Sequence, residues 1–176
     1  MKKPYFIYVG NAYPHKNLER AIEAIVACEV NFAIVSSRGV FAERLEKLIK
    51  KHNAEKFVKL LGFVPDKELK TLYKGAEGFI FPSLYEGFGL PGLEAMNAGT
   101  IVLASNIPVF REIYKDKVIY FNPLDYASIE RSIGDVLVMD KEKRKRIIAE
   151  GRGFVKNYSW PSMAKKTLGV YSEVFK

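Results

Sequence analysis

The stretch Ser83–Gly99, SLYEGFGLPGLEAMNAG, contains the residues that decide the fold. Just ahead of it, the apolar run 78–82, GFIFP, is typical of a buried strand bounded by glycine and proline. Pro91 favours the first turn of a helix, where its missing N–H would be unpaired anyway, and Gly99 is typical of a helix end. The sequence therefore predicts a strand, a glycine-rich turn at its carboxyl end and a short helix over 91–98.

Two carboxylates flank this turn, because Glu86 lies in the loop and Glu94 in the first turn or so of the helix. Glycines let the backbone approach a ligand closely, and free N–H groups at a helix N-terminus favour an anion. Taken singly, each feature is usually structural, since a glutamate near a helix start is commonly a dipole partner. Together they suit a ligand with hydroxyl groups on either side of its phosphates, which is the layout of a nucleotide-sugar.

Apolar and amphipathic segments alternate along the whole chain. Six near-continuous apolar segments are predicted strands, over 5–10, 30–36, 57–61, 78–81, 100–104 and 118–121. Each precedes a predicted helix, over 18–28, 40–51, 66–74, 91–98, 108–114 and 125–139, and two more helices follow over 141–158 and 161–175. The pattern predicts one α/β domain over 1–176, with a doubly wound, Rossmann-like parallel sheet that binds ligands beyond the carboxyl ends of its strands.

Composition excludes several classes of function. The single Cys28 cannot form an internal disulfide, and His15 and His52 are too few and too isolated to suggest a metal centre. The net charge is +8, but the basic residues are spread over most predicted helices among acids. The densest run, KEKRKR at 141–146, is typical of a solvated face and otherwise of a contact for anionic lipid or an acidic partner. Nucleic acid is not an expected partner, because no aromatic-interleaved basic motif is present.

We expect a cytoplasmic protein, since the sequence shows neither an apolar run of about 18 residues nor a charged-then-apolar leader. The first strand is followed by VGNAYPHKN at 9–17 rather than by GxGxxG, which disfavours a nicotinamide dehydrogenase. Lys16 precedes a predicted helix, where an ammonium without a ligand would be unfavourable beside the positive dipole end. Its charge would reach a diphosphate held at a helix N-terminus.

The motif EGFGLPGLEAMNAG at 86–99, with the Pro-Ser before it, resembles the Glu-x7-Glu signature of the retaining GT-B glycosyltransferases of the group 1 family. The loop 10–17 resembles the loop that commonly reads Gly-Arg-x-x-x-x-Lys and binds the donor diphosphate in that family. Lys16 matches the lysine, and Asn11 stands in the arginine position. LGFVPD at 61–66 is similar to the loop that lies against the nucleotide base, and Tyr-Ser-Trp at 158–160 resembles the break before the C-terminal helix.

The resemblance implies a role for each matching residue. Lys16 and the helix N-terminus would hold the diphosphate, with Asn11 at most a neutral hydrogen-bond donor. Glu86 would hold hydroxyls of the transferred sugar and is the catalytic candidate. Glu94 would bind the ribose, since a carboxylate pairs with two adjacent hydroxyls. The expected substrate-binding residues are Asn11, Lys16, Gly62, Phe63, Val64, Glu86, Gly87, Phe88, Gly89, Leu90 and Glu94.

The resemblance implies a hexosyltransferase-type enzyme that transfers a sugar, with retention, from a UDP-sugar or GDP-mannose to a glycan or lipid. Neither a metal nor a cofactor is expected, because basic groups and a helix dipole would stabilise the leaving diphosphate and the sequence lacks an Asp-x-Asp motif. A GT-B-like nucleotide-sugar epimerase and a non-catalytic sugar-nucleotide-binding module are the alternatives. The base, the sugar and the acceptor are not specified by the sequence.

Group 1 enzymes have two such domains, and the acceptor-binding half precedes a strand like the one predicted over 5–10. Since four residues precede that strand here, we expect the donor-binding C-terminal domain alone, with nucleotide-sugar binding but little transfer in isolation. We also expect helix 161–175 to pack toward an N-terminal domain. A peripheral contact with the inner face of the membrane is a further expectation.

Overall fold

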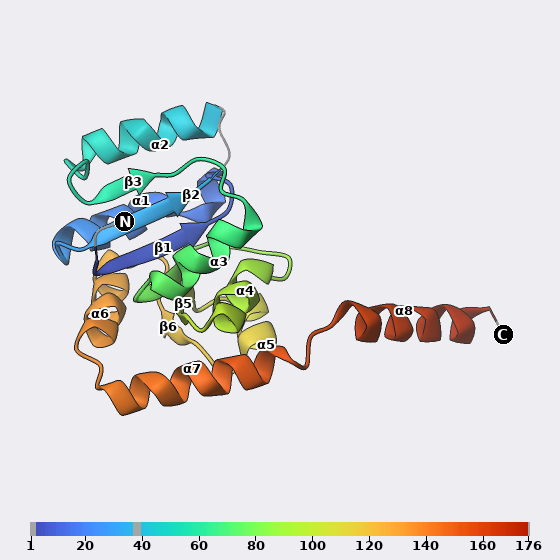
Figure 1. The fold of residues 1–176 in the computed structure, drawn as a ribbon. Coiled ribbons are helices and arrows are strands. Elements are labelled where there is room, and N and C mark those ends of the chain that lie inside the picture. The colour runs from blue at the N-terminus through green and yellow to red at the C-terminus, as the bar shows by residue number, and fades with distance from the viewer. Residues whose placement is uncertain (1–2, 37–39, 176) are drawn as a thin grey trace.

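The fold is built on one six-stranded sheet, seen in a computed structural model that describes residues 3–36 and 40–175 (Figure 1). The strands are β1 (Tyr5–Val9), β2 (Asn31–Val35), β3 (Val58–Leu60), β4 (Gly78–Phe81), β5 (Ile101–Ser105) and β6 (Ile119–Phe121). Their order is β3-β2-β1-β4-β5-β6, and every pairing is parallel. The predicted doubly wound sheet is confirmed, with strand ends within one residue of those expected. The ends of the predicted domain, 1–2 and 176, lie outside the described residues.

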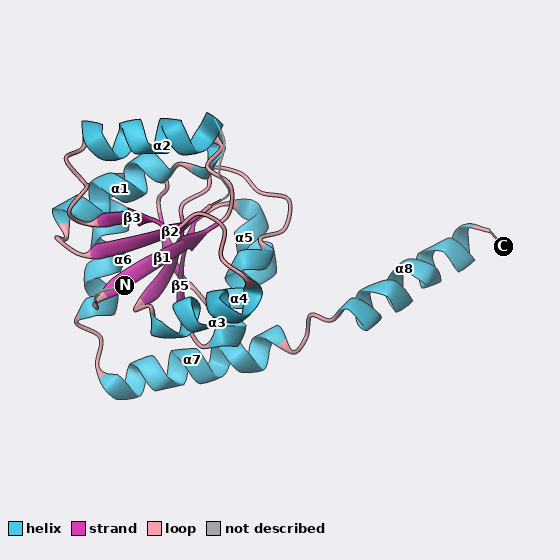
Figure 2. Ribbon diagram, turned by 45° about the horizontal axis from the view of Figure 1, so that its top comes forward, coloured by secondary structure: helices cyan, strands magenta, loops and turns pink. Residues whose placement is uncertain are grey.

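Helices cover both faces of the sheet (Figure 2). They are α1 (Leu18–Ala27), α2 (Val40–Lys51), α3 (Asp66–Gly75), α4 (Leu90–Ala98), α5 (Pro108–Tyr114), α6 (Tyr126–Leu137), α7 (Lys141–Val155) and α8 (Trp160–Val174), with a short 3-10 helix, η1 (Pro14–Lys16). Helix α1 packs against α6 and α2, whereas α4 packs against α3 and α7. Two predicted helix ends were wrong by more than one residue: α6 begins at Tyr126 and ends at Leu137, and α7 ends at Val155. The amides of Asn157 and Tyr158 bond back only three residues, which closes α7 with a turn.

A chain of buried aromatic rings leads from the middle of the sheet toward the loop after β4. Ring centroids are 5.3 Å apart for Phe79 and Phe81, 4.7 Å for Phe81 and Phe110, and 5.1 Å for Phe110 and Tyr114. All four side chains are buried. Burial of each aromatic ring contributes about 1.5–3 kcal/mol, so the base of that loop rests on one of the firmest parts of the core.

The strand order reverses between β1 and β4, which are neighbours in the sheet although about 70 residues separate them. The loops that follow these two strands consequently leave the same edge of the sheet side by side. In doubly wound folds this is the place where ligands bind. The topology thus brings together the two segments in which the sequence predicted site residues.

Helix α8 projects away from the body of the domain in both views (Figures 1 and 2). It has no buried residue, and its exposed apolar side chains include Trp160, Leu168, Tyr171 and Val174. Among the described helices, none combines the length and the hydropathy needed to cross a bilayer.

Candidate functional site

The β1–α1 and β4–α4 loops are fastened together by buried polar contacts. The amide N–H of Leu84 donates to the carbonyl of His15 at 2.8 Å. The side-chain amide of Asn17 donates to the carbonyls of Pro82 and Pro123, at 3.0 and 2.8 Å. Asn17 is buried and adopts a left-handed backbone conformation with φ of 54°, which asparagine tolerates well. Nothing in the sequence indicates that Asn17 positions these loops.

Lys16 and Glu86 meet where these loops touch. Lys16 Nζ lies 2.5 Å from Glu86 Oε1, and each side chain is only 12% exposed. The buried hydroxyl of Ser83 donates to the same oxygen at 2.7 Å. The sequence assigned Lys16 to a diphosphate and Glu86 to a sugar as separate roles, whereas the structure places them in direct contact. The ammonium at the start of α1 is therefore balanced by a carboxylate, and a diphosphate would compete with Glu86 for it.

Two buried tyrosines near this ion pair hold the loops in place. The hydroxyl of Tyr8 donates to the carbonyl of Asn11 at 2.6 Å, whereas the Asn11 side chain is exposed. The hydroxyl of Tyr114 donates to the carbonyl of Gly89. Burial, and secondarily the charge of Glu86, raises the pKa of both tyrosines, so they act as neutral donors. Neither tyrosine was predicted as part of the site. For Tyr114, nothing in the sequence shows that α5 reaches the turn.

The glycine-rich turn is shaped by two glycines that the structure distinguishes from Gly87. Gly89 has φ of +100°, and a Cβ there would meet the Tyr114 hydroxyl. A Cβ on Gly92 would meet the same hydroxyl, whereas one on Gly87 would have open space around it. Helix α4 begins directly after Gly89, and the first N–H groups of a helix have no partner within it. The turn therefore presents Phe88, Gly89 and Leu90 at a helix N-terminus, as predicted.

Glu94 lies one turn into α4 and faces α3. It lines a cavity of about 280 Å³ with Asp66, Leu69, Lys70, Tyr73, Asn97 and Ala98. Burial raises the pKa of Glu94, the nearby charge of Asp66 adds to this, and the Tyr73 hydroxyl, 3.5 Å from Oε2, opposes it. Glu86 is thus paired with a cation and Glu94 is paired with a neutral hydroxyl. Two carboxylates in such different surroundings are suited to different parts of a ligand.

Of the loop predicted to lie against a base, over 61–66, only the last residue, Asp66, lines this cavity. Phe63 is 81% exposed, and Gly62 has φ of +67°. The cavity is lined instead from Asp66 onward, by the helix that this loop starts. Tyr73 was not predicted as a site residue, and Asp66 was predicted only as the last residue of that loop. Their helical spacing from Leu69 and Lys70 was visible, but not that this face would turn toward Glu94.

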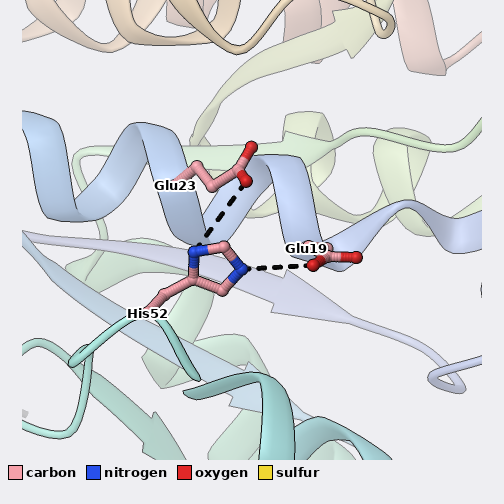
Figure 3. Close-up of side chains that lie close together, drawn as sticks. All are labelled: Glu19, Glu23 and His52. Atoms are coloured by element: carbon pink, nitrogen blue, oxygen red, sulfur yellow. Dashed lines mark hydrogen bonds and ion pairs between the residues drawn. The ribbon is translucent and has the colours of Figure 1, made fainter. Parts of the chain in front are cut away.

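His52 is not isolated, which corrects the sequence prediction (Figure 3). Its Nε2 lies 3.2 Å from Glu19 Oε1, and its Nδ1 lies 3.8 Å from Glu23 Oε1. Lys51 Nζ also lies 2.7 Å from Glu19 Oε1. Three side chains that could hold a metal therefore come together, but the Lys51 ammonium already pairs with Glu19. The cluster ties the end of α2 to α1.

Relatives of the chain were found by family and by sequence. The family described as "Glycosyl transferases group 1" matches residues 1–154. The O-antigen chain mannosyltransferase B of Escherichia coli is 32% identical over 173 residues, which cover 95% of this chain and 45% of that protein. The O-antigen chain mannosyltransferase RfbU of Salmonella typhimurium is 33% identical over 164 residues, with 92% and 45% coverage.

Solved structures agree with these matches. Sucrose-phosphate synthase (tll1590) from Thermosynechococcus elongatus superposes with a TM-score of 0.85 at 26% identity, covering 98% of this chain and 45% of that one. The C-terminal domain of LpcC, a glycosyl transferase group 1 family protein from Francisella tularensis, superposes with a TM-score of 0.72 at 25% identity, covering 87% of this chain and 85% of that one. The fold and the switch-point loops define a GT-B glycosyltransferase domain. The chain belongs to the group 1 glycosyltransferases, and it spans 45% of the length of the two O-antigen mannosyltransferases.

Proposed function

We propose that this chain is the donor half of a glycosyltransferase and binds a nucleotide-sugar across α4. The observation that carries the proposal is that the paired Lys16 and Glu86 come just before the N-terminus of α4, and that Glu94 with its cavity follows one turn into the same helix. Phosphates fit the helix N-terminus and the ammonium, the ribose fits Glu94, and the sugar fits Glu86. The order of the three groups along the ligand then matches the order of their binding groups along segment 86–94.

In the proposed transfer, the bond between the anomeric carbon and the diphosphate oxygen breaks, and the diphosphate leaves with the electron pair. Lys16 and the α4 N-terminus stabilise the negative charge that develops on the diphosphate, so the step needs no metal. Glu86 faces the sugar, where positive character develops as the leaving group departs. The acceptor hydroxyl bonds to the anomeric carbon on the face that the diphosphate leaves and gives its proton to an oxygen of the departing diphosphate, so the configuration is retained.

We further infer that GDP-mannose is the donor to test first. The two O-antigen relatives are named mannosyltransferases, and both match more than nine-tenths of this chain. A UDP-sugar is the alternative, and an epimerase would bind the same class of ligand. The acceptor, a glycan or lipid, would contact a preceding domain like the one that lengthens those relatives, with α8 packing toward that domain.

The test is calorimetric titration of residues 1–176 with GDP-mannose, UDP-glucose, GDP and guanosine. Lys16→Ala should weaken the binding of GDP about tenfold or more, because a charged hydrogen bond contributes about 1.5–3 kcal/mol. The affinity for guanosine should stay unchanged, because only the phosphates contact the ammonium. Lys59→Ala, which removes an exposed lysine of β3, is the matched control. Equal losses for GDP and guanosine, or no binding of any nucleotide-sugar by the unmodified chain, would contradict the proposal.

A further inference from the structure

Four aromatic rings lie beside the Lys16–Glu86 pair, and the roles proposed above use none of them. Phe41, Tyr13, His15 and Tyr85 follow one another in ring contact, and we call them the aromatic row. Successive ring centroids are 4.6, 5.9 and 4.5 Å apart. The row is open to solvent, since 37% of Phe41, 43% of Tyr13 and 65% of Tyr85 are exposed.

The row is fixed to the site because the two loops run in register. The Leu84 amide bonds to the His15 carbonyl, the His15 ring stacks on Tyr85, and Lys16 pairs with Glu86. Consecutive residues of one loop thus contact consecutive residues of the other: His15 contacts Tyr85, and Lys16 contacts Glu86. The stack of His15 on Tyr85 is therefore adjacent to the Lys16–Glu86 ion pair. This places the row next to the carboxylate proposed to hold the donor sugar.

The row has the chemistry of a surface that holds a sugar ring. His15 stacks on one face of Tyr85 with an interplanar angle of 21°, so the exposed part of Tyr85 includes its other face. Aromatic faces carry partial negative charge, which attracts the C–H groups of a pyranose face, and the hydroxyl and imidazole edges hydrogen-bond sugar hydroxyls. A nucleobase would also stack, but the proposed function assigns the nucleoside to Glu94, whose cavity is lined by none of the four rings.

We propose that the aromatic row is a glycan subsite, in which Tyr85 and Tyr13 hold the acceptor saccharide next to the donor sugar at Glu86. The proposal rests on the proposed function. It gives the donor half of the enzyme a part in acceptor recognition, and it accounts for aromatic side chains that stay exposed without covering any core. Sugar rings laid along the row would extend from Glu86 toward the start of α2.

The experiment uses residues 1–176 and a linear mannotriose as the probe, with saturation-transfer NMR and calorimetry. Transfer from the aromatic protons to mannotriose is expected. Tyr85→Ala should weaken the binding of mannotriose about five- to tenfold, in the range expected for one lost aromatic contact. The binding of GDP-mannose should weaken less. Tyr85→Phe should restore most of the affinity, because it keeps the ring. Tyr171→Ala, in the exposed helix α8, is the matched control and should bind mannotriose like the unmodified chain.

Each outcome separates this proposal from the function on which it rests. If GDP-mannose binds but mannotriose shows no transfer, the subsite is wrong and the donor role stands. The subsite is also overturned if Tyr85→Ala leaves mannotriose affinity unchanged, or if guanosine rather than mannotriose receives transfer from the row. If neither GDP-mannose nor mannotriose binds, both proposals fail. Far-ultraviolet circular dichroism and melting curves for each variant exclude loss of the fold as the cause.

Discussion

The contact between Lys16 and Glu86 determines how each residue can be tested. Both side chains are nearly buried, so removal of one charge leaves the other without its partner. The ion pair also means that the free protein already satisfies the groups that a ligand would use. Binding of a diphosphate must then shift Lys16 from Glu86 to the phosphates, and the free carboxylate becomes available to the sugar hydroxyls.

Glu86→Gln should therefore separate the two ends of the ligand. The substitution keeps the shape and removes the charge that competes for Lys16, so GDP should bind at least as tightly as to the unmodified chain. The gain in affinity from GDP to GDP-mannose should shrink, because a neutral amide is a weaker acceptor by about 1 kcal/mol. Calorimetry with both ligands measures this, with the exposed Glu55→Gln as the control. An unchanged preference for GDP-mannose over GDP would show that Glu86 does not contact the sugar.

Tyr114 has a role that a conservative change can isolate. Tyr114→Phe keeps the ring in the core but leaves the Gly89 carbonyl without its donor, which costs about 1–3 kcal/mol. We expect a melting temperature a few degrees lower, together with severalfold weaker GDP binding, because the turn is no longer held. Tyr158→Phe is the matched control, because the Tyr158 hydroxyl also donates to a backbone carbonyl, that of Ile113 in α5, at 2.7 Å. It should lower stability alone, and equal losses of GDP affinity in both variants would contradict the positioning role.

At the scale of elements, the N-terminus of α4 is formed by the turn rather than by a capping side chain. No side chain caps this helix within the described residues, and Gly89 serves as its N-cap. The left-handed backbone of Gly89 aims the following N–H groups outward, while Tyr114 fills the space that a Cβ would take. The helix end that we propose to bind the diphosphate thus depends on the absence of a side chain at one position.

Gly89→Ala and Gly87→Ala should differ sharply in stability although they lie two residues apart. Gly89→Ala combines backbone strain of about 1–3 kcal/mol with a collision against Tyr114, so we expect a clear fall in the free energy of unfolding. Gly87→Ala has open space around the added carbon and should change that free energy by less than about 0.5 kcal/mol. Urea denaturation followed by circular dichroism measures both. Similar effects at the two positions would mean that the turn does not have the described conformation.

For the molecule as a whole, the sequence predicted six strands in a parallel sheet and both loops of the candidate site, because continuous apolar strands and glycine-bearing turns are local signals. It could not predict that Lys16 contacts Glu86, since that depends on β1 and β4 becoming neighbours across about 70 residues of chain. Asn17, Tyr8 and Tyr114 were missed because their hydrogen-bond partners are backbone carbonyl groups, which leave no mark in the sequence. The ends of α6 and α7 were misplaced because their closing turns use ordinary residues.

The pH dependence of stability follows from two glutamates with opposite shifts. Hydrogen bonds from Lys51 and His52 lower the pKa of Glu19, so its contribution is present above pH 4.5 and is lost as the pH falls through the lower, folded-state value. The pKa of Glu94 is raised, mainly by burial. The folded state then holds the Glu94 proton more tightly than the unfolded state, and stability falls as the pH rises from 4.5 through the raised value.

Glu94→Gln should therefore weaken ligand binding without lowering the free energy of unfolding. The amide can still accept the Tyr73 hydroxyl bond and has no charge to desolvate, so at pH 7 the variant should be at least as stable as the unmodified chain. Its advantage in urea denaturation should disappear as the pH falls toward 4.5, where Glu94 becomes protonated in both states. Binding of GDP-mannose should weaken about tenfold, because a carboxylate accepts the two ribose hydroxyls more strongly than an amide does. A carboxylate kept at a cost to the fold is expected of a binding residue, whereas a structural Glu94 would lose stability on substitution and leave the affinity unchanged.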